Sequence, residues 1–368
     1  MKIVVTGATG FIGKNLCVML REHGYHDIVE VDRETPETVL SKSLSAADFV
    51  YHLAGVNRPD DEAEFQYGNS DFTQYIVDEL SRSNKHVPIV LSSSIQAERD
   101  NAYGISKRLA EQLVEQYGQH TNSPYFIYRF PNVFGKWCRP NYNSFVATFC
   151  HNILNGLDIT INDPEAAVTL VYIDDVCARL IGLLDSDSES GYKRVTPEYP
   201  TTVGEVATLL RSFKESRDNL VTEDVGTGLT RALYSTYLSY MTPELFSYPI
   251  PSYGDERGVF SEMLKTKQTG QFSFFTAHPG ITRGGHYHHS KNEKFLVLKG
   301  KALFKFEHIA TGERYELYTD GSSPQIVETV PGWSHDITNI GDDEMIVILW
   351  ANEIFDREAP DTVAYPLS

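Results

Sequence analysis

The stretch KIVVTGATGFIG runs from Lys2 to Gly13 and places three glycines at regular intervals, at positions 7, 10 and 13. Its first half is apolar and β-branched, which predicts a short strand. The segment FIGKNLCVMLREHG that follows has helical periodicity and ends on Gly24, a residue that often caps helices. A glycine turn between a strand and a helix lets the backbone approach a pyrophosphate, and the helix N-terminus offers it free N–H groups. The sequence therefore predicts a dinucleotide site, although such a triplet also occurs in ordinary tight turns.

Strand-like and helix-like segments alternate through the first part of the chain. Further apolar runs, DIVEVD, DFVYHLAG, VPIVLSSS and PYFIYRFP, are separated by periodic segments such as YGISKRLAEQLVEQYG. This alternation predicts an α/β fold, a Rossmann-like doubly wound parallel sheet with helices on both faces. It continues through LVYIDDVCARLIGLL to a helix expected at TVGEVATLLRSFKES.

The pattern changes after about Tyr248. Short aromatic and β-branched runs separated by Gly or Pro turns follow, among them FSFFTAH, KFLVLKG, ALFKFEHI and MIVILWANEIF. Many short strands at close spacing predict an all-β antiparallel barrel or sandwich. We therefore expect two domains, residues 1–245 and 246–368, with a proline-containing linker between Met241 and Gly254.

The composition argues against a general affinity for polyanions. The formal net charge is −18, whereas nucleic acid and anionic membranes bind cationic surfaces. No run approaches the ~20 apolar residues of a membrane span, and we find no leader segment. None of the four cysteines belongs to a C-x-x-C pair, and their pattern does not resemble a disulfide framework. We therefore expect reduced thiols. We expect a cytoplasmic protein that binds neither nucleic acid nor membranes.

Two adjacent residues give opposite indications about the dinucleotide. Asp32 ends the second expected strand, where an acidic side chain commonly accepts a hydrogen bond from the adenosine ribose of NAD. Arg33 follows, and a cation there can hold the 2′-phosphate of NADP. NAD and NADP both remain open on this evidence, as does a solvated charge pair.

Tyr103 and Lys107 lie four residues apart at the start of an expected helix and therefore share a face. A nearby ammonium lowers the pKa of a phenol, so Tyr103 becomes able to donate a proton to a carbonyl oxygen. Ser94, at the end of VPIVLSSS, is expected to hydrogen-bond the same oxygen, with Ser93 as its rival by register. The spacing alone is weak, because Tyr287 and Lys291 also match it.

Six motifs in order resemble the extended short-chain dehydrogenase/reductases: TGATGFIG, HLAG, SSS, YGISK, RFPNVFG and YIDDV. The resemblance covers about the first 240 residues and implies that Tyr103 is the acid/base and that Lys107 holds the nicotinamide ribose. The predicted catalytic residues are Ser94, Tyr103 and Lys107. The predicted cofactor-binding residues are Gly7, Thr9, Gly10, Phe11, Ile12, Gly13, Asp32, Arg33, Leu53, Ala54, Gly55, Tyr103 and Lys107.

Many members of this family act on nucleotide sugars. Open α/β sheets bind ligands on the loops that follow their strands. Five polar residues on such loops are predicted to bind substrate. Three of them are cations that could neutralise a diphosphate. The alternative for each cation is an ordinary surface charge. These residues are Asn57, Arg58, Asn132, Lys136 and Arg139.

The second half of the chain carries a candidate metal site. His286 and His288 are two apart in an expected strand, so both side chains face one way. Glu293 opens the strand-like EKFLVLKG, and His335 follows a Pro-Gly turn. Three imidazoles and one carboxylate suit a divalent transition metal such as zinc. His289 is the rival of His288 by register.

The spacing His-x-His-x4-Glu-x6-Gly, ending at Gly300, resembles the first cupin motif. Pro331-Gly332-x-x-His335-x3-Asn339 resembles the second, although its Pro and Gly are adjacent where the family has one residue between them. DERGVFSE, residues 255–262, is similar to a segment of the dTDP-sugar 3,5-epimerases. The resemblance covers about residues 250–368 and implies a cupin, that is, a jelly-roll β-barrel.

Across the whole chain, HLAGVNRP, KWCRPNYNS, LYSTYLSY, DERG and KNEKFLV resemble the bifunctional capsular-polysaccharide biosynthesis enzymes of the CapF family. The resemblance implies a homodimer with a cupin-bound zinc. It also implies C3 epimerisation of UDP-2-acetamido-2,6-dideoxy-β-L-arabino-4-hexulose, then NADPH-dependent reduction at C4 to UDP-N-acetyl-6-deoxy-L-talosamine. Two alternatives are an NAD-dependent dehydratase or C4 epimerase with a sugar-binding cupin, and a non-enzymatic nucleotide sensor.

Overall fold

The structure is a computed structural model. It describes residues 1–368 except Asn84, Asp187, Pro251, 256–257, 262–263, 267–269, 354–357 and Ser368. The chain forms two compact units. The first comprises Met1–Phe134, Asn141–Ser144 and Val168–Pro200, and the second comprises Gly135–Pro140, Phe145–Ala167 and Thr201–Ser368. Each is described here by itself.

The first unit is built on a six-stranded parallel sheet whose order is β2-β1-β3-β4-β5-β8. The order reverses at β1, since β2 and β3 flank it on opposite sides. Such a reversal opens a crevice at the carboxyl ends of the strands, where doubly wound sheets bind ligands. The strands are β1 (Ile3–Thr6), β2 (Ile28–Val31), β3 (Phe49–His52), β4 (Ile89–Ser94), β5 (Tyr125–Phe130) and β8 (Gly191–Lys193).

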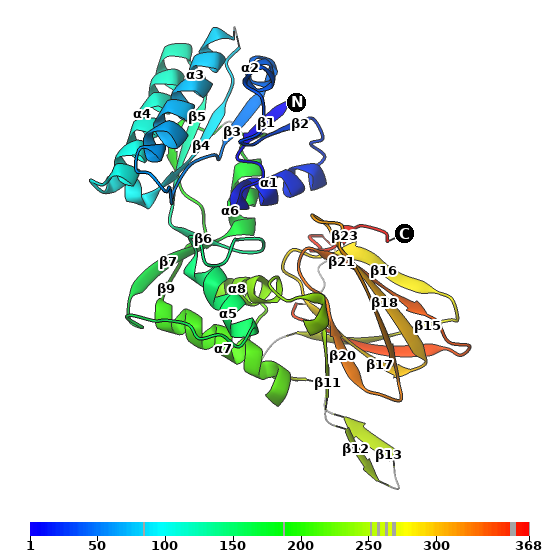
Figure 1. Ribbon diagram of the computed structural model, residues 1–368. Coiled ribbons are helices and arrows are strands. Elements are labelled where there is room, and N and C mark those ends of the chain that lie inside the picture. The colour runs from blue at the N-terminus through cyan, green and yellow to red at the C-terminus, as the bar shows by residue number, and fades with distance from the viewer. Residues whose placement is uncertain are drawn as a thin grey trace. The chain divides into compact units, whose positions relative to one another are not determined.

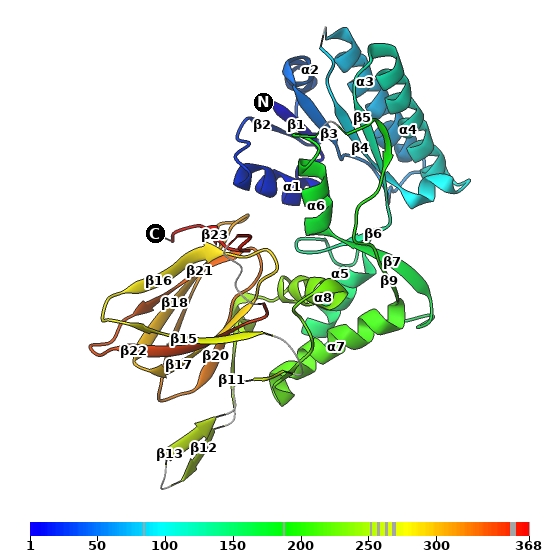
Figure 2. The same cartoon turned by 180° about the vertical axis from the view of Figure 1, so that it is seen from behind.

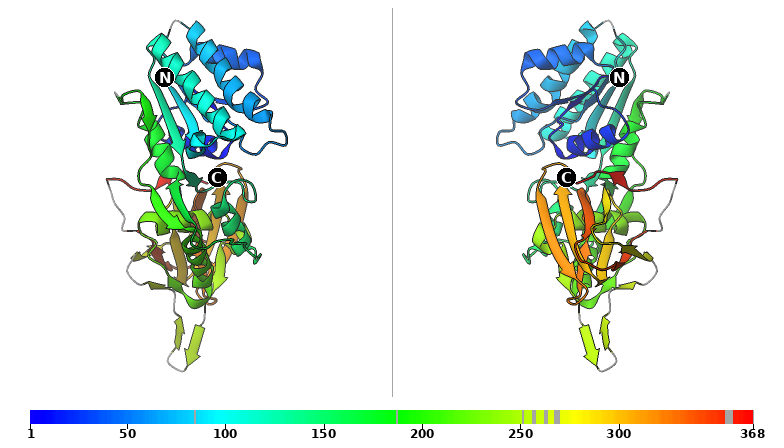
Figure 3. Two further views of the ribbon diagram at one scale, coloured as in Figure 1. Left: turned by 90° about the vertical axis from the view of Figure 1, so that its left-hand side faces the viewer. Right: turned by 90° about the vertical axis from the view of Figure 1, so that its right-hand side faces the viewer.

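Helices cover both faces of this sheet, as Figures 1 and 2 show from opposite sides. One face carries α2 (Glu37–Ala46), α3 (Phe72–Arg82) and α4 (Ala102–Thr121), and the other carries α1 (Phe11–Glu22) and α6 (Ile173–Ile181). Figure 3 shows α3 and α4, in cyan, side by side. A π-helix, η1 (Gln66–Asp71), runs directly into α3, and a 3₁₀ turn, η2 (Ile95–Glu98), precedes α4.

The core of the first unit lies between the sheet and α2, α3 and α4. Fully buried aliphatic residues from both layers form it, including Val4, Val50, Ile89, Ile76 and Leu80. A short sheet with the order β6-β7-β9 follows in the chain: β6 (Asn132–Phe134), β7 (Ala167–Tyr172) and β9 (Tyr199–Thr202).

The second unit contains two five-stranded sheets with antiparallel pairing. One has the order β11 (Ser247–Pro249), β20 (Gln325–Glu328), β17 (Glu293–Lys299), β22 (Met345–Ala351) and β15 (Gln271–Ala277). The other has the order β19 (Arg314–Asp320), β18 (Lys301–His308), β21 (Trp333–Asn339), β16 (Thr282–Tyr287) and β23 (Val363–Ala364). The remaining strands are β10 (Val221–Thr222), β12 (Ser252–Asp255), β13 (Gly258–Ser261) and β14 (Lys265–Thr266).

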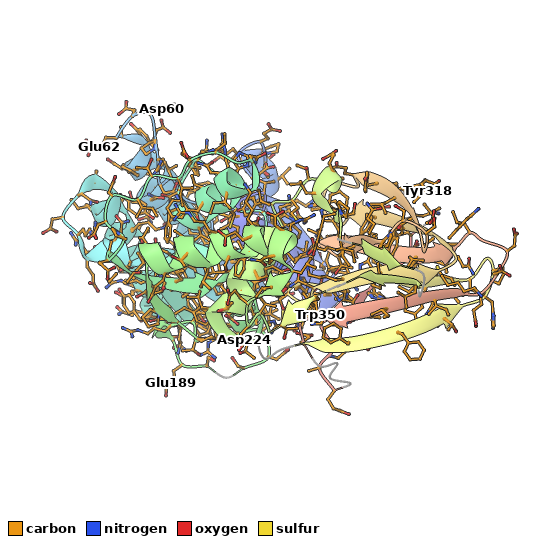
Figure 4. All side chains as sticks on the ribbon, turned by 90° about the horizontal axis from the view of Figure 1, so that it is seen from below. Asp60, Glu62, Glu189, Asp224, Tyr318 and Trp350 are labelled. Carbon is orange, nitrogen blue, oxygen red and sulfur yellow. The ribbon has the colours of Figure 1, made fainter. Side chains whose placement is uncertain are left out.

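Aromatic side chains fill the space between these two sheets. The ring centroids of Phe295 on β17 and Phe304 on β18 lie 5.6 Å apart, and Phe304 stacks on Phe306. Successive side chains of a strand point to opposite faces of its sheet, so some face the interior and others the solvent. Trp350 on β22 is fully buried, whereas Tyr318 on β19 is exposed at the surface (Figure 4). The predicted fold class, a Rossmann-like α/β sheet followed by an all-β cupin-like domain, is confirmed.

Three helices belong to the second unit together with the β-sheets: α5 (Phe145–Leu154), α7 (Val203–Asn219) and α8 (Gly228–Leu238). A 3₁₀ turn, η3 (Pro243–Leu245), leads from α8 into β11. The helix expected at TVGEVATLLRSFKES corresponds to α7, whose start is fixed by a reciprocal capping box between Thr202 and Glu205. The domain boundary at residues 245/246 stays a prediction.

Candidate functional sites

The turn between β1 and α1 is too crowded for side chains. Gly7 has a φ of +70°, and a Cβ there would lie 2.7 Å from the backbone nitrogen of Ala54. A Cβ on Gly13 would lie 2.2 Å from the carbonyl oxygen of Gly7. Helix α1 starts after Gly10 with no capping side chain and no acidic residue in its first turn. The open N–H groups of this turn fit a pyrophosphate.

The loop after β3 is held against this turn. The backbone N–H groups of Leu53 and Ala54 donate to the carbonyl and the hydroxyl oxygen of Thr6, at 3.2 and 3.3 Å. Asn69 in η1 accepts from the N–H of Val56 at 2.9 Å and donates to its carbonyl at 3.0 Å. Asn69 therefore fixes the backbone around Gly55, and sequence analysis missed it because no local pattern relates it to that loop.

The predicted catalytic residues lie where β4 ends and α4 begins: Ser94 is the last residue of β4, and Tyr103 and Lys107 are in the first turns of α4. The Ser94 hydroxyl hydrogen-bonds the Tyr103 phenol. The Lys107 ammonium donates to the carbonyl of Ser92 at 2.7 Å, and it lies 3.4 Å from where a Cβ on Gly55 would be. Ser93 points elsewhere and hydrogen-bonds the buried carboxylate of Glu111. The geometry thus selects Ser94 over Ser93.

Burial controls the acidities of this cluster. It lowers the pKa of Lys107 to about 8, against a partial opposing effect of Glu111. It raises the pKa of Tyr103 above its usual value of 10.0, and the Ser94 hydrogen bond only partly offsets this. The expected lowering of the Tyr103 pKa by Lys107 is therefore not found. A raised pKa keeps the phenol protonated, as a proton donor requires.

Asp32 and Arg33 follow β2 and are both exposed. The Asp32 carboxylate accepts from the N–H of Glu34 and from the hydroxyl of Thr35, each at 3.0 Å. These contacts form a local turn and do not distinguish NAD from NADP, so both indications from the sequence stand.

The five predicted substrate residues are divided between the two units. Asn57, Arg58 and Asn132 belong to the first, and Lys136 and Arg139 belong to the second. The Asn132 amide donates to the carbonyl of Thr169 at 3.4 Å. Lys136 is only 2% exposed, which argues against its being a solvated surface charge. Their role in binding substrate stays a prediction.

The four predicted metal ligands converge within the second unit. His286 on β16 and His335 on β21 are partners in the strand register, with ring centroids 4.9 Å apart. His288 follows β16 directly, and Glu293 is the first residue of β17. One ligand atom from each of the four lies within 4.8 Å of all the others. The rival His289 faces away from this cluster and packs against Tyr287, with ring centroids 5.5 Å apart.

A glycine pair makes the convergence of these strands possible. β16 bulges between Gly284 and His286. Gly284 has a φ of +103°, and a Cβ there would lie 2.9 Å from the carbonyl oxygen of His335. The bulge re-aims the end of β16 so that His286 and His288 both face Glu293.

The cluster has the chemistry of a metal site. Burial lowers the pKa of His286 to about 4 and also lowers that of His335, so both imidazoles are neutral at pH 7. Burial opposes ionisation of Glu293, but His288 and His335 outweigh it and hold the carboxyl pKa well below its usual range. Nδ1 of His335 is buried without a hydrogen-bond partner among the described residues, and its Nε2 lies 3.5 Å from a Glu293 oxygen. Neutral imidazoles around a carboxylate fit a divalent cation.

Further predictions concern the second unit and the chain as a whole. Glu256, Arg257 and Glu262 of the DERGVFSE segment lie outside the described residues. Tyr287 and Lys291, the second match to the Tyr-x-x-x-Lys spacing, lie beside the metal cluster, and the Lys291 ammonium is 2.9 Å from a Glu293 oxygen. Homodimer formation stays a prediction. Among the residues that the structure describes, no helix is long and apolar enough to cross a membrane.

Comparisons with known proteins agree with both halves of the molecule. Residues 3–195 match the NAD dependent epimerase/dehydratase family, and residues 253–363 match the polysaccharide biosynthesis C-terminal domain. UDP-2-acetamido-2,6-beta-L-arabino-hexul-4-ose reductase of Pseudomonas aeruginosa is 54% identical, over 99% of this chain and 98% of the relative.

Solved structures show the same relationship. The capsular polysaccharide assembling protein CapF of Staphylococcus aureus matches over 100% of both chains, with a TM-score of 0.69 and 44% identity. UDP-glucuronic acid 4-epimerase of Bacillus cereus matches 58% of this chain and 83% of that chain, with a TM-score of 0.53, and at 21% identity it supports the fold alone.

The two matched regions define a nucleotide-cofactor domain of the epimerase/dehydratase type joined to a cupin-like domain of polysaccharide biosynthesis. The chain belongs to the CapF-like family, which combines these two domains. The family predicted from the sequence is thus confirmed, and it implies a nicotinamide cofactor.

Proposed function

We propose that this protein is a bifunctional nucleotide-sugar enzyme that inverts C3 of a UDP-linked 4-keto-6-deoxy amino sugar and then reduces its C4 ketone. The proposed substrate is UDP-2-acetamido-2,6-dideoxy-β-L-arabino-4-hexulose, and the product is UDP-N-acetyl-6-deoxy-L-talosamine, for capsular or O-antigen polysaccharide. The printed name of the Pseudomonas aeruginosa relative supports this substrate. The observation that carries the proposal is the convergence of four metal-ligating side chains in a chain that also holds a Ser–Tyr–Lys site.

The reductase half rests on residues of the first unit. The residues of the glycine turn would hold NADPH, which would supply the hydride for C4 of the sugar. The protonated Tyr103 phenol donates its proton to the carbonyl oxygen, and the Ser94 hydroxyl, already hydrogen-bonded to it, orients the same oxygen. The ketone gains one hydride and one proton, which completes its reduction to the alcohol.

The epimerase half rests on the cluster of His286, His288, Glu293 and His335. A zinc or similar ion bound there would withdraw electron density from a nearby carbonyl and so acidify the adjacent C3–H. Loss of a proton from one face of C3 and its return to the other inverts the centre without net oxidation.

Asp32 favours a second candidate function, an NAD-dependent dehydratase or C4 epimerase with a sugar-binding cupin. Its carboxylate stands where NAD-specific proteins bind the adenosine ribose. This function predicts enzyme purified with NAD already bound and no net consumption of NADPH or NADH with any 4-keto sugar. The bifunctional reductase instead predicts stoichiometric oxidation of NADPH, in preference to NADH.

The test is to incubate the protein with the 4-keto UDP sugar and NADPH in heavy water and to analyse the product by NMR. Wild-type protein should give a C4 alcohol that carries deuterium at C3. Tyr103→Phe should abolish NADPH oxidation but still exchange C3–H. His335→Ala should lose the exchange, whereas His289→Ala, whose side chain faces away from the cluster, should retain it.

Two results would contradict the proposal. Wild-type protein that reduces C4 without solvent deuterium at C3 would remove the epimerase half. Folded Tyr103→Phe and His335→Ala proteins that each lose both reactions would show that the two sites are not separable.

A further inference from the structure

A short loop joins two of the proposed metal ligands and is held by a residue more than sixty positions away in the chain. The loop runs from His288 to Glu293. Three consecutive N–H groups in it donate to the carboxylate of Asp361: His289 at 2.9 Å, Ser290 at 2.7 Å and Lys291 at 2.7 Å. The Ser290 hydroxyl donates to the same carboxylate at 2.9 Å. Successive N–H groups that converge in this way form an anion-binding concavity, which Asp361 fills.

The backbone of Asp361 also contacts His288, one of the proposed metal-binding residues. Its carbonyl oxygen lies 2.5 Å from Nδ1 of His288. A carbonyl can only accept, so Nδ1 of His288 carries a proton and donates it to this oxygen. Nε2 therefore faces the inside of the cluster, 3.3 Å from Oε2 of Glu293, and is the nitrogen that a metal would bind. A hydrogen bond that fixes the tautomer and the orientation of a metal-binding histidine in this way raises its affinity for the metal.

Asp361 is itself well anchored. Two residues later the chain enters β23, which pairs with β16 through Tyr287↔Val363. Arg231 of α8 lies 3.8 Å from the Asp361 carboxylate and hydrogen-bonds the Ser290 hydroxyl. The pKa of Asp361 reflects this setting: burial opposes its ionisation, but the histidines and N–H groups around it hold the pKa well below 3.8.

We propose that Asp361 is a positioning residue of the metal site, which tightens metal binding without ligating the metal. Its carboxylate clamps the loop between His288 and Glu293, and its carbonyl oxygen sets the tautomer of His288. The inference rests on the proposed function, since it takes the cluster to bind a divalent metal. It adds a residue that the mechanism above does not use.

The test compares Zn²⁺ affinity of the full-length wild-type protein and of Asp361→Asn, measured by competition with a chromophoric chelator. The amide keeps the size of the side chain but cannot accept from all four donors at once. Loss of an outer contact of this kind is expected to weaken metal binding by about 10–100-fold. The Co²⁺-loaded variant should also show an altered visible absorption spectrum, which a remote structural defect would not cause.

Asp320→Asn is the matched control. The Asp320 carboxylate also caps a turn in the same unit, since it accepts from the N–H of Ser322 at 2.7 Å, but it belongs to β19, outside the cluster. The control should bind Zn²⁺ and Co²⁺ like the wild type. Equal losses in both variants would overturn the proposal, as would an unchanged affinity of folded Asp361→Asn.

A second variant covers the case in which Asp361→Asn does not fold. Ser290→Ala removes one hydrogen bond to Asp361 and the contact with Arg231, and it should lower Zn²⁺ affinity by a smaller factor. An unchanged affinity of Ser290→Ala would then refute the clamp. If the wild-type protein itself binds no Zn²⁺ or Co²⁺, the metal part of the proposed function fails. If the wild type binds metal tightly and Asp361→Asn binds it equally well, only the role of Asp361 fails.

Discussion

At the scale of the residue, Lys107 is a buried cation whose ionisation affects stability. Burial lowers its pKa in the folded protein to about 8, from 10.5. Between these values the unfolded chain keeps the proton that the folded protein has released. The unfolded state thus binds more protons, and folding stability from this group rises with pH in that window.

Raising the pH from 8 to 9.5 should stabilise the cofactor-free wild type relative to Lys107→Met. We expect the gap between their free energies of unfolding to shift by about 2 kcal/mol in favour of the wild type. Urea unfolding followed by circular dichroism at both pH values measures it. Subtracting the variant removes the contribution of the buried tyrosines, which titrate at higher pH. A pH-independent difference would show that Lys107 titrates at its ordinary pKa.

Residue types and spacing singled out residues that the fold brings together, but they left the side-chain register open. Ser93 and Ser94 face opposite sides of β4, and only the packing of Glu111 under Ser93 shows which of them meets Tyr103. The same holds for His288 and His289 at the end of β16. Register depends on where the rest of the sheet lies, so local sequence cannot determine it.

At the scale of the element, a buried ionic cluster joins α7 to the strands of one β-sheet. Glu328 on β20 lies 2.6 Å from the Arg217 guanidinium of α7, and it also pairs with the Lys294 ammonium of β17. Lys294 in turn donates to the Tyr248 hydroxyl at 3.0 Å. Burial would lower the pKa of Lys294, but Glu328 and its other neighbours raise it well above 10.5.

Glu328→Ala should therefore destabilise the second unit by about 3–5 kcal/mol, because it leaves two buried cations without their shared carboxylate. All three tryptophans, Trp137, Trp333 and Trp350, lie in this unit. Tryptophan fluorescence during urea unfolding thus reports on it. As a control, Arg314→Ala breaks the pair of Glu307 with a 62% exposed guanidinium and should cost at most about 1 kcal/mol. Similar losses in both variants would contradict the prediction.

Elements with a strong local period were predictable, whereas long-range associations were not. The βαβα alternation gave β1 to β5 and their helices, and the short aromatic runs gave the two β-sheets. Nothing local indicates that α7 and α8 pack in the same unit as those sheets. The contacts of Arg217 with Glu328 and of Arg231 with Ser290 join segments far apart in the chain, and single-sequence periodicity carries no information about them.

At the scale of the whole molecule, the chain keeps its two candidate sites on separate folded units. Ser94, Tyr103 and Lys107 belong to the first unit, and the metal cluster belongs to the second. A substitution at one site should therefore leave the other intact. In the proposed function, reduction of the ketone at C4 would remove the epimerised intermediate and make the preceding equilibrium effectively one-way.

This separation predicts that two inactive proteins complement each other. Tyr103→Phe keeps the metal cluster and should release C3-epimerised ketone, which His335→Ala should reduce with NADPH. Neither variant alone should form the product alcohol. An equimolar mixture should oxidise NADPH after a lag that shortens as total protein rises, because the intermediate must first accumulate in solution. Mixing either variant with Tyr103→Phe/His335→Ala is the control and should give no product. If the mixture stays inactive while each variant retains its own half-reaction, the intermediate never leaves the molecule that forms it.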